Sequence, residues 1–194
     1  MSKFFRLGGV AASIILIAVG VGAIVIGASG RSEVRDNIER ENISGTPDMT
    51  PDAVKAEVEK AGLTGQDLPT CNVADKEIDN GNRAKCFAEY IRIHTLEATD
   101  GKTYAEMPRF TGKNGKPTSD QEAAAVDPKS GAPVSNPQRE IWVTSTALST
   151  ALNTSYFAQQ VALFSVVMGI ALLLTGIGFL VLTLGLAKRE GRAD

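Results

Sequence analysis

The chain has 194 residues, of which 43% are hydrophobic and 22% are charged, and its formal net charge at pH 7 is −2. Proteins that bind nucleic acids carry a basic excess for contact with phosphates, so this balance predicts no nucleic acid partner. Most of the apolar residues lie in two uncharged stretches near the ends of the chain, and these stretches dominate the prediction.

The first uncharged stretch covers residues 7–30, and the second covers residues 141–187. A helix of about 20 apolar residues crosses a bilayer core of about 30 Å. Both stretches reach this length, so we expect two transmembrane helices at residues 7–30 and 158–187, with the lipid bilayer as a partner. A cleaved signal peptide is the alternative for the first stretch, although its apolar core exceeds the usual length of roughly 7–15 residues.

Basic residues flank both predicted spans on the side facing the chain ends: Lys3, Arg6, Lys188, Arg189 and Arg192. Cytoplasmic ends of membrane spans carry such an excess of Lys and Arg. We therefore expect a two-pass protein of the cell membrane, with cytoplasmic tails at residues 1–6 and 188–194. Residues 31–157 would then form an extracytoplasmic domain.

Cys71 and Cys86 are the only cysteines, and both lie in the predicted extracytoplasmic domain. An even number of cysteines in an oxidising compartment indicates one disulfide, worth about 3 kcal/mol for a loop of this length. The alternatives are a redox pair, which usually has the C-x-x-C spacing absent here, and a zinc site, for which two thiols and one histidine are too few. We expect a structural disulfide and no metal or cofactor.

Two segments of the central region have the pattern of short helices. Thr50 is suited to be an N-cap and Pro51 to the first helical turn, which predicts a helix to about Ala61. Residues 83–98 form the most convincing soluble helix, with apolar side chains at a period of 3.6 residues. Its predicted shared face consists of Phe87, Tyr90, Ile91 and His94.

The segment at residues 108–137 is rich in Pro, Gly, Ser, Asn and Asp and predicts an extended, flexible surface loop. A partner-binding loop is the alternative. From residue 138 to 187 the pattern is helical, and a continuous helix of this length would be about 75 Å long. The predicted fold class is therefore all-α, with two transmembrane helices extended outward and a small helical extracytoplasmic domain held by one disulfide.

Small residues recur four apart within both predicted spans, a pattern used for close helix packing in lipid. We expect one span to pack on the other through these faces, and packing on a partner membrane protein is the alternative. The predicted packing residues are Ala18, Gly22, Ala23, Gly27, Ser165, Gly169 and Gly176.

Side chains for catalysis are scarce in this sequence. Neither span carries an ionisable residue, which argues against an ion or proton pathway. His94 is the sole histidine, so a Ser–His or Cys–His mechanism would have to use it. We expect no catalytic residues and a protein that is not an enzyme. The candidate functional residues of the outer domain are the polar side chains of His94, Glu97, Lys102 and Tyr104.

The run FAEYIRIHTLEATDGKTYAEM at residues 87–107 resembles a family of small two-span membrane proteins of actinobacteria. Residues 141–179 are similar to that family's second span and the stretch before it. Some members are labelled aromatic ring-opening dioxygenase, a label that this sequence contradicts, since a non-haem iron site needs about two histidines and a carboxylate. The resemblance implies the topology and an envelope location, and no activity.

Three classes of function fit these features. We predict a non-enzymatic accessory or scaffold subunit of a membrane complex, which would co-purify with a partner protein in mild detergent. The alternative is an envelope sensor or regulator, whose outer domain would bind a lipid or small ligand in an apolar pocket between that domain and the spans. An enzyme acting on envelope lipids would need a cleft with clustered polar side chains.

Overall fold

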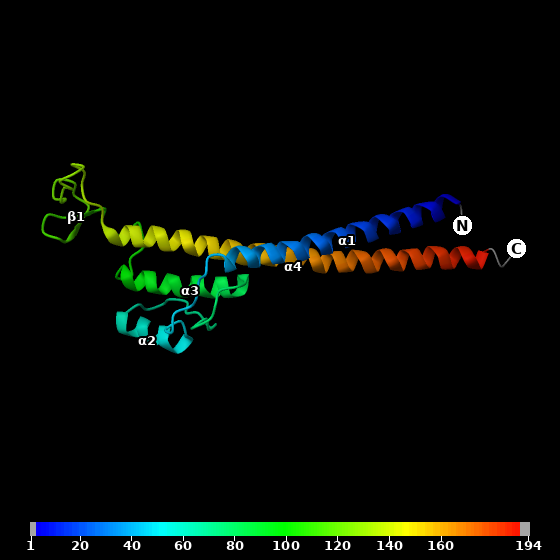
Figure 1. Cartoon of the computed structure of the whole chain (residues 1–194), viewed down its shortest axis with the longest axis horizontal. Helices are drawn as coiled ribbons and strands as arrows, with labels where there is room; N and C mark the ends of the chain where they lie inside the picture. The colour runs from blue at the N-terminus through cyan, green and yellow to red at the C-terminus, as the bar shows by residue number, and fades with distance from the viewer. Residues whose placement is uncertain (1–2, 191–194) are drawn as a thin grey trace. The chain divides into compact units, whose positions relative to one another are not determined.

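The computed structural model describes residues 3–190, so the tail positions Arg192 and Asp194 lie outside the described residues. The described chain is mostly helical, in the order α1 (Lys3–Glu39), α2 (Pro51–Ala61), α3 (Gly81–Ala98), β1 (Phe110–Thr111), β2 (Pro117–Thr118) and α4 (Pro137–Glu190) (Figure 1). It divides into two compact units. The helix-pair unit comprises the described residues up to Asn37 and from Phe157 onward, and the central unit comprises Ile38–Tyr156.

Helices α1 and α4 are long and apolar enough to cross a membrane. Their most apolar windows have mean hydropathies of 2.7 and 2.5, and only 11% and 17% of the residues in these windows are buried. The core helix of a soluble protein would bury most of such a window. The predicted spans at residues 7–30 and 158–187 fall within these two helices.

Within the helix-pair unit, α1 and α4 pack side by side in opposite directions (Figure 1). Gly9 faces Thr183 near one end of the pair, and Gly27 faces Ala162 near the other. At Gly20, an added Cβ would lie 2.7 Å from the carbonyl oxygen of Gly169. No side chain fits at that distance, so the two backbones can approach this closely only because the residues are glycines.

The residues buried between these helices are spaced by seven. On α1 and α4 they are Ser13, Gly20, Gly27, Ala162, Gly169, Gly176 and Thr183. We call these residues the seam. A repeat of seven residues corresponds to 3.5 residues per turn, which keeps one seam of each helix facing its partner in a left-handed supercoil.

The predicted spacing of four therefore describes this packing only in part. Gly27, Gly169 and Gly176 lie in the seam, whereas Ala18 is exposed and a Cβ added at Gly22 would meet nothing within 4 Å. Ala23 and Ser165 are half-buried. The heptad repeat of small residues was the signal in the sequence that would have identified Gly20 and Ala162.

Helix α2 in the central unit has the boundaries that its sequence predicts. The Thr50 side chain accepts a hydrogen bond from the Ala53 amide, and Pro51 occupies the first turn. Gly62 ends the helix with φ 68°, in the left-handed region that favours glycine. The buried face of α2 consists of Val54 and Val58.

Helix α3 begins two residues earlier than predicted because Asn80 caps it, accepting a hydrogen bond from the Arg83 amide. Its buried side chains lie at helical spacing, and α2 packs against this helix. The larger buried side chains of α3 are Phe87, Tyr90, Ile93 and Leu96. The core of the central unit is thus small and centred on α3, as expected for a domain that needs a covalent crosslink.

The predicted disulfide is confirmed. Cys71 and Cys86 are bonded, with their Cα atoms 6.1 Å apart, and the bond joins the loop before α3 to the second turn of that helix. The Tyr90 hydroxyl donates a hydrogen bond of 2.6 Å to the Cys71 carbonyl, one turn further along α3. The loop is therefore attached to the helix both covalently and by a buried tyrosine.

The segment that the sequence analysis predicted as an extended loop contains a small β-structure. Strands β1 and β2 pair antiparallel, with Phe110 opposite Thr118. Single bridges then join Gly112 to Ala124 and Val126 to Pro133. These pairs are too short to produce an alternating apolar pattern, so the sequence contained no strand signal here.

Candidate functional site

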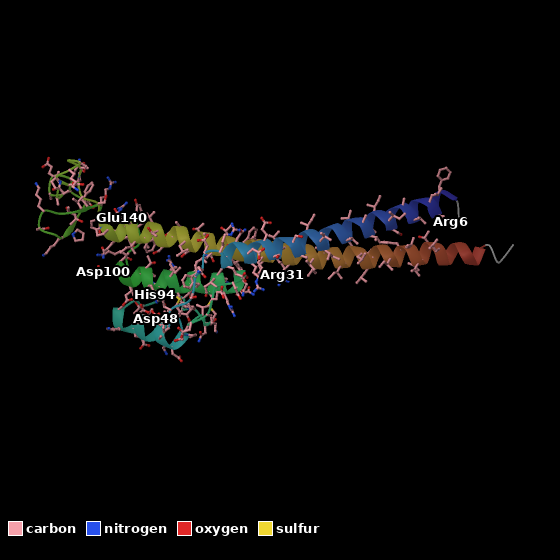
Figure 2. All side chains as sticks on the ribbon, in the orientation of Figure 1. Arg6, Arg31, Asp48, His94, Asp100 and Glu140 are labelled. Atoms are coloured by element: carbon pink, nitrogen blue, oxygen red, sulfur yellow. A yellow bond between two sulfur atoms is a disulfide. The ribbon has the colours of Figure 1, made fainter. Side chains whose placement is uncertain are left out.

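Three ionisable side chains from different parts of the central unit meet beside α3. His94 lies on α3, Glu57 on α2 and Asp48 in the loop before α2 (Figure 2 labels His94 and Asp48). The His94 Nε2 atom is 3.4 Å from Asp48 Oδ2 and 3.4 Å from Glu57 Oε2. The three polar atoms all lie within 4.8 Å of one another. We call these residues the His94 cluster.

The packing of α2 on α3 explains how these residues meet. Glu57 precedes the buried Val58, and His94 follows the buried Ile93, so both side chains leave from the edge of the α2–α3 contact. Met49, buried at 4% exposure, holds the chain next to Asp48 against the core. The cluster is therefore supported by the core of the central unit.

The Nε2 atom of His94 is buried and forms no hydrogen bond with any residue that the structure describes. The rest of the ring is less shielded, since 27% of the side chain is exposed. Leaving a buried polar atom unpaired costs about 1–3 kcal/mol, and such an atom requires an explanation. Its two nearest carboxylate oxygens are close enough for electrostatic attraction but do not meet hydrogen-bond geometry.

The carboxyl groups of the cluster have different proton affinities. Burial raises the pKa of Glu57 to about 7, helped by a hydrogen bond with Glu97 and by the negative charges of Glu97 and Asp48. A hydrogen bond from the Thr46 side chain lowers the pKa of Asp48. The site thus combines a carboxyl group with a lowered pKa, a carboxyl group with a raised pKa and an imidazole nitrogen. Such a group of side chains can exchange protons or bind a cation.

Of the four outer-domain candidates, the structure brings together His94 and Glu97, because each interacts with Glu57. Lys102 is exposed, and its carbonyl accepts a hydrogen bond from Thr99. Tyr104 packs its ring under the guanidinium of Arg139, with the Arg139 Cζ atom 3.7 Å from the ring centre. Neither Lys102 nor Tyr104 is part of the His94 cluster.

Sequence reasoning missed Asp48 and Glu57. Both are far from His94 along the chain, and neither belongs to a recognisable metal-binding motif. Their proximity depends on the fold of the loop before α2 and on the packing of α2 against α3.

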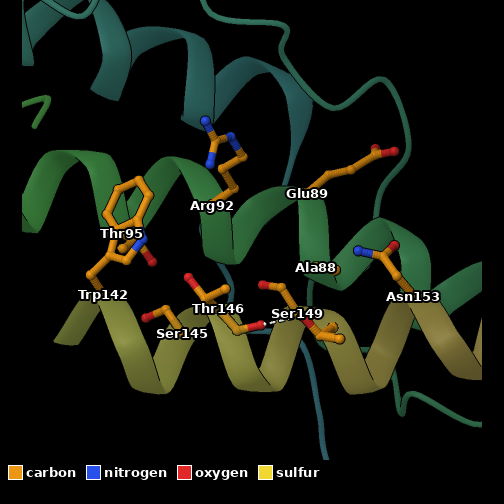
Figure 3. A pocket seen from close by; sticks show the side chains of 10 residues that line it. Ala88, Glu89, Arg92, Thr95, Trp142, Ser145, Thr146, Ser149 and Asn153 are labelled. Carbon is orange, nitrogen blue, oxygen red and sulfur yellow. Dashed lines mark hydrogen bonds between the residues drawn. The ribbon is translucent and has the colours of Figure 1, made fainter. Parts of the chain in front are cut away.

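A second candidate feature is a cavity of about 270 Å³ between α3 and the first part of α4 (Figure 3). Trp142 lies at one end of it, with the Arg92 guanidinium 5.7 Å from its ring centre. The α4 side of the cavity is otherwise lined by hydroxyl and amide side chains, namely Ser145, Thr146, Ser149, Thr150 and Asn153. Most of the residues that line this cavity thus carry a charged, hydroxyl or amide group, and the two helices that form it both belong to the central unit at this point.

Comparison with known proteins gave no match to a family model, to a curated protein or to a solved structure. The geometry of the chain is therefore the basis for any proposed function.

Proposed function

We propose that this chain is a non-enzymatic, two-pass membrane protein of the cell envelope that acts as an accessory subunit of a membrane complex. In this proposal α1 and α4 cross the bilayer and the central unit lies outside the cell. The proposal includes membership in the actinobacterial two-span family, based on the runs at residues 87–107 and 141–179.

The antiparallel helix pair supports the proposed topology. Because Gly9 faces Thr183, the start of α1 and the end of α4 lie at the same end of the pair. If both helices cross a membrane, both tails would therefore be on one side of it. Basic residues near the two ends favour the cytoplasm for that side. The exposed side chains of the pair also suit contact with lipid, as they include Ile26, Phe164 and Leu182.

Topology is testable with a thiol probe, because both native cysteines are in the disulfide. Lys129 is exposed in the central unit, and a Lys129→Cys variant should react in intact cells with a maleimide that cannot cross membranes. A cysteine appended after residue 194 should react only after lysis. The reverse pattern would overturn the proposed orientation.

An apolar stripe on α4 is the observation that carries the proposal of a partner protein. The seam positions Gly176, Gly169 and Ala162 continue towards the start of α4, at the same spacing of seven, as Ser155, Leu148 and Ile141. In the seam these positions are buried, but Leu148 and Ile141 are 39% and 43% exposed. Leu148 and Ile141 thus have the heptad spacing of a helix-packing surface but are exposed. Such exposed apolar side chains favour contact with a helix of another protein.

We propose that this partner is a helix of another membrane protein that extends beyond the bilayer and packs on Leu148 and Ile141. The test is affinity purification of the full-length protein from its native membrane in mild detergent. A Leu148→Lys substitution should abolish co-purification of the partner, because a charge would be buried in the contact.

Val143 provides the matched control. It is apolar and 54% exposed, and it lies about 200° around α4 from Ile141, on the opposite face. A Val143→Lys variant should therefore retain the partner. Equal retention by the Leu148 and Val143 variants would contradict the proposed surface, and the absence of any stable partner would contradict the proposed role.

A sensor or regulator is the second candidate, and the His94 cluster is the observation that favours it. Side chains that exchange protons or cations, supported by a domain core, can couple the conditions outside the membrane to the central unit. If the sensor role is correct, a His94→Ala variant should retain the partner. It should abolish the cell's response to a change in external pH or cation concentration.

A further inference from the structure

We infer that Asp48, Glu57 and His94 bind a divalent transition-metal ion, with zinc as the expected occupant. This inference goes beyond the accessory role, because it concerns a ligand of the central unit and does not depend on a partner protein. It also departs from the prediction of no metal site, which considered a zinc site built on the two thiols and an iron site that needs about two histidines.

The distances within the cluster match those around a metal ion. Two ligand atoms that each lie about 2.1 Å from a tetrahedral ion are about 3.4 Å apart. His94 Nε2 is 3.4 Å from Asp48 Oδ2 and 3.4 Å from Glu57 Oε2. The two carboxylate oxygens lie no more than 4.8 Å apart, and 53% of the Asp48 side chain is exposed.

The state of the His94 nitrogen is a second, independent observation. Charge-assisted hydrogen bonds between imidazolium and carboxylate groups are about 2.7–2.9 Å long, and this nitrogen forms none with the described residues. It is nevertheless buried and directed between two carboxylates. A cation held between the three atoms would satisfy the nitrogen and both oxygens together.

The donor atoms indicate which class of ion fits. Mg²⁺ and Ca²⁺ are bound by oxygen ligands, whereas imidazole suits zinc and its first-row neighbours. Three protein ligands leave a fourth position open for water or a further ligand.

The first test uses the wild-type protein and relies on His94 being the only histidine of the chain. The full-length protein is purified in detergent without a histidine tag, labelled with ¹⁵N-histidine and treated with EDTA, which is then removed. One equivalent of zinc should shift the Nε2 resonance of His94, and a large excess of magnesium should not. An unchanged histidine signal at saturating zinc would overturn the inference.

Calorimetric zinc titration of variants is the second test. We expect one ion per chain in the wild type. His94→Ala and Asp48→Asn should each weaken binding by on the order of 100-fold or more, because each removes one of the three proposed ligands. Asp48→Asn preserves the shape of the side chain, so it provides the answer if His94→Ala does not fold.

The matched control is Glu59→Gln, which removes a carboxylate from the exposed side of α2. This variant should bind zinc as the wild type does. Wild-type affinity in both the His94 and Asp48 variants would show that zinc binds elsewhere and would overturn the inference. Neither test involves a partner, so failure here is distinct from failure of the accessory-subunit proposal.

Discussion

Gly45 allows two loop segments of the central unit to touch. A Cβ at this position would collide with the carbonyl oxygen of Val73, and backbone hydrogen bonds join Gly45 to Lys76 and Asp75 on the same segment. No pattern in the sequence distinguishes Gly45, because a glycine after a helix usually indicates only that the helix ends.

We predict that Gly45→Ala lowers the free energy of unfolding of the central unit by about 1–3 kcal/mol, as overpacking does in other buried sites. The measurement is urea unfolding in detergent, followed by the fluorescence of Trp142, the single tryptophan. The neighbouring Ser44 is exposed, and Ser44→Ala should change the stability by less than about 0.5 kcal/mol. Equal effects of the two substitutions would contradict the proposed close contact.

Tyr90 is fully buried and donates its hydroxyl hydrogen to the Cys71 carbonyl. We predict that Tyr90→Phe lowers the unfolding free energy by about 1–3 kcal/mol, because the carbonyl loses its partner. The same urea titration measures this change. A variant as stable as the wild type would show that water replaces the hydroxyl.

Tyr90 also predicts a pH dependence. Burial raises the pKa of its hydroxyl above the usual value, followed by the negative charge of Glu89 as a smaller cause. A group with a raised pKa in the folded state stabilises the fold fully below the unfolded pKa, which is about 10, and loses this contribution as the pH rises through the folded value. Stability of the central unit should therefore fall above about pH 10, and the fall should be smaller in Tyr90→Phe.

At the scale of elements, the disulfide attaches an irregular loop to α3. We predict that Cys71→Ser with Cys86→Ser costs about 2–5 kcal/mol, the usual range for removal of a native disulfide from a small domain. Urea unfolding with and without a reductant measures the change. The reductant should have no effect on the double variant, and an effect there would point to a target other than this bond.

Because only one of two nearby glycines of α1 lies in the seam with α4, we predict different effects of the same substitution at the two positions. Gly20→Leu should separate the helices, because a Cβ there already overlaps the Gly169 backbone, whereas Gly22→Leu should be tolerated in open space. Amide hydrogen exchange of α1 in detergent measures this, with faster exchange expected only for Gly20→Leu. Faster exchange in both variants would contradict the seam.

At the scale of the whole molecule, the two units differ in what stabilises them. The central unit depends on a small core and a disulfide, whereas helices in an apolar phase keep their backbone hydrogen bonds because no water is available to replace them. We predict that, in detergent, urea unfolds the central unit at lower concentrations than those at which most of the helical circular dichroism is lost. The fluorescence of Trp142 follows the unfolding of the central unit. If the fluorescence and the circular dichroism changed over the same range of urea concentration, the prediction would be wrong.

The elements that follow from local chemistry were predictable from the sequence. The cap at Thr50, the left-handed Gly62 and the apolar length of α1 and α4 depend on residues close together in the chain, as does the spacing that identified α3. The pairing of Cys71 with Cys86 was also predictable, because two cysteines leave one possible partner each.

The His94 cluster and the Gly45 contact depended on the tertiary structure. Each one joins atoms that are distant along the chain, and their proximity is set by the packing of whole elements. A sequence states which side chains are available and which local conformations they favour. Only the tertiary structure decides which of them meet, because that depends on the relative positions of elements that no local pattern encodes.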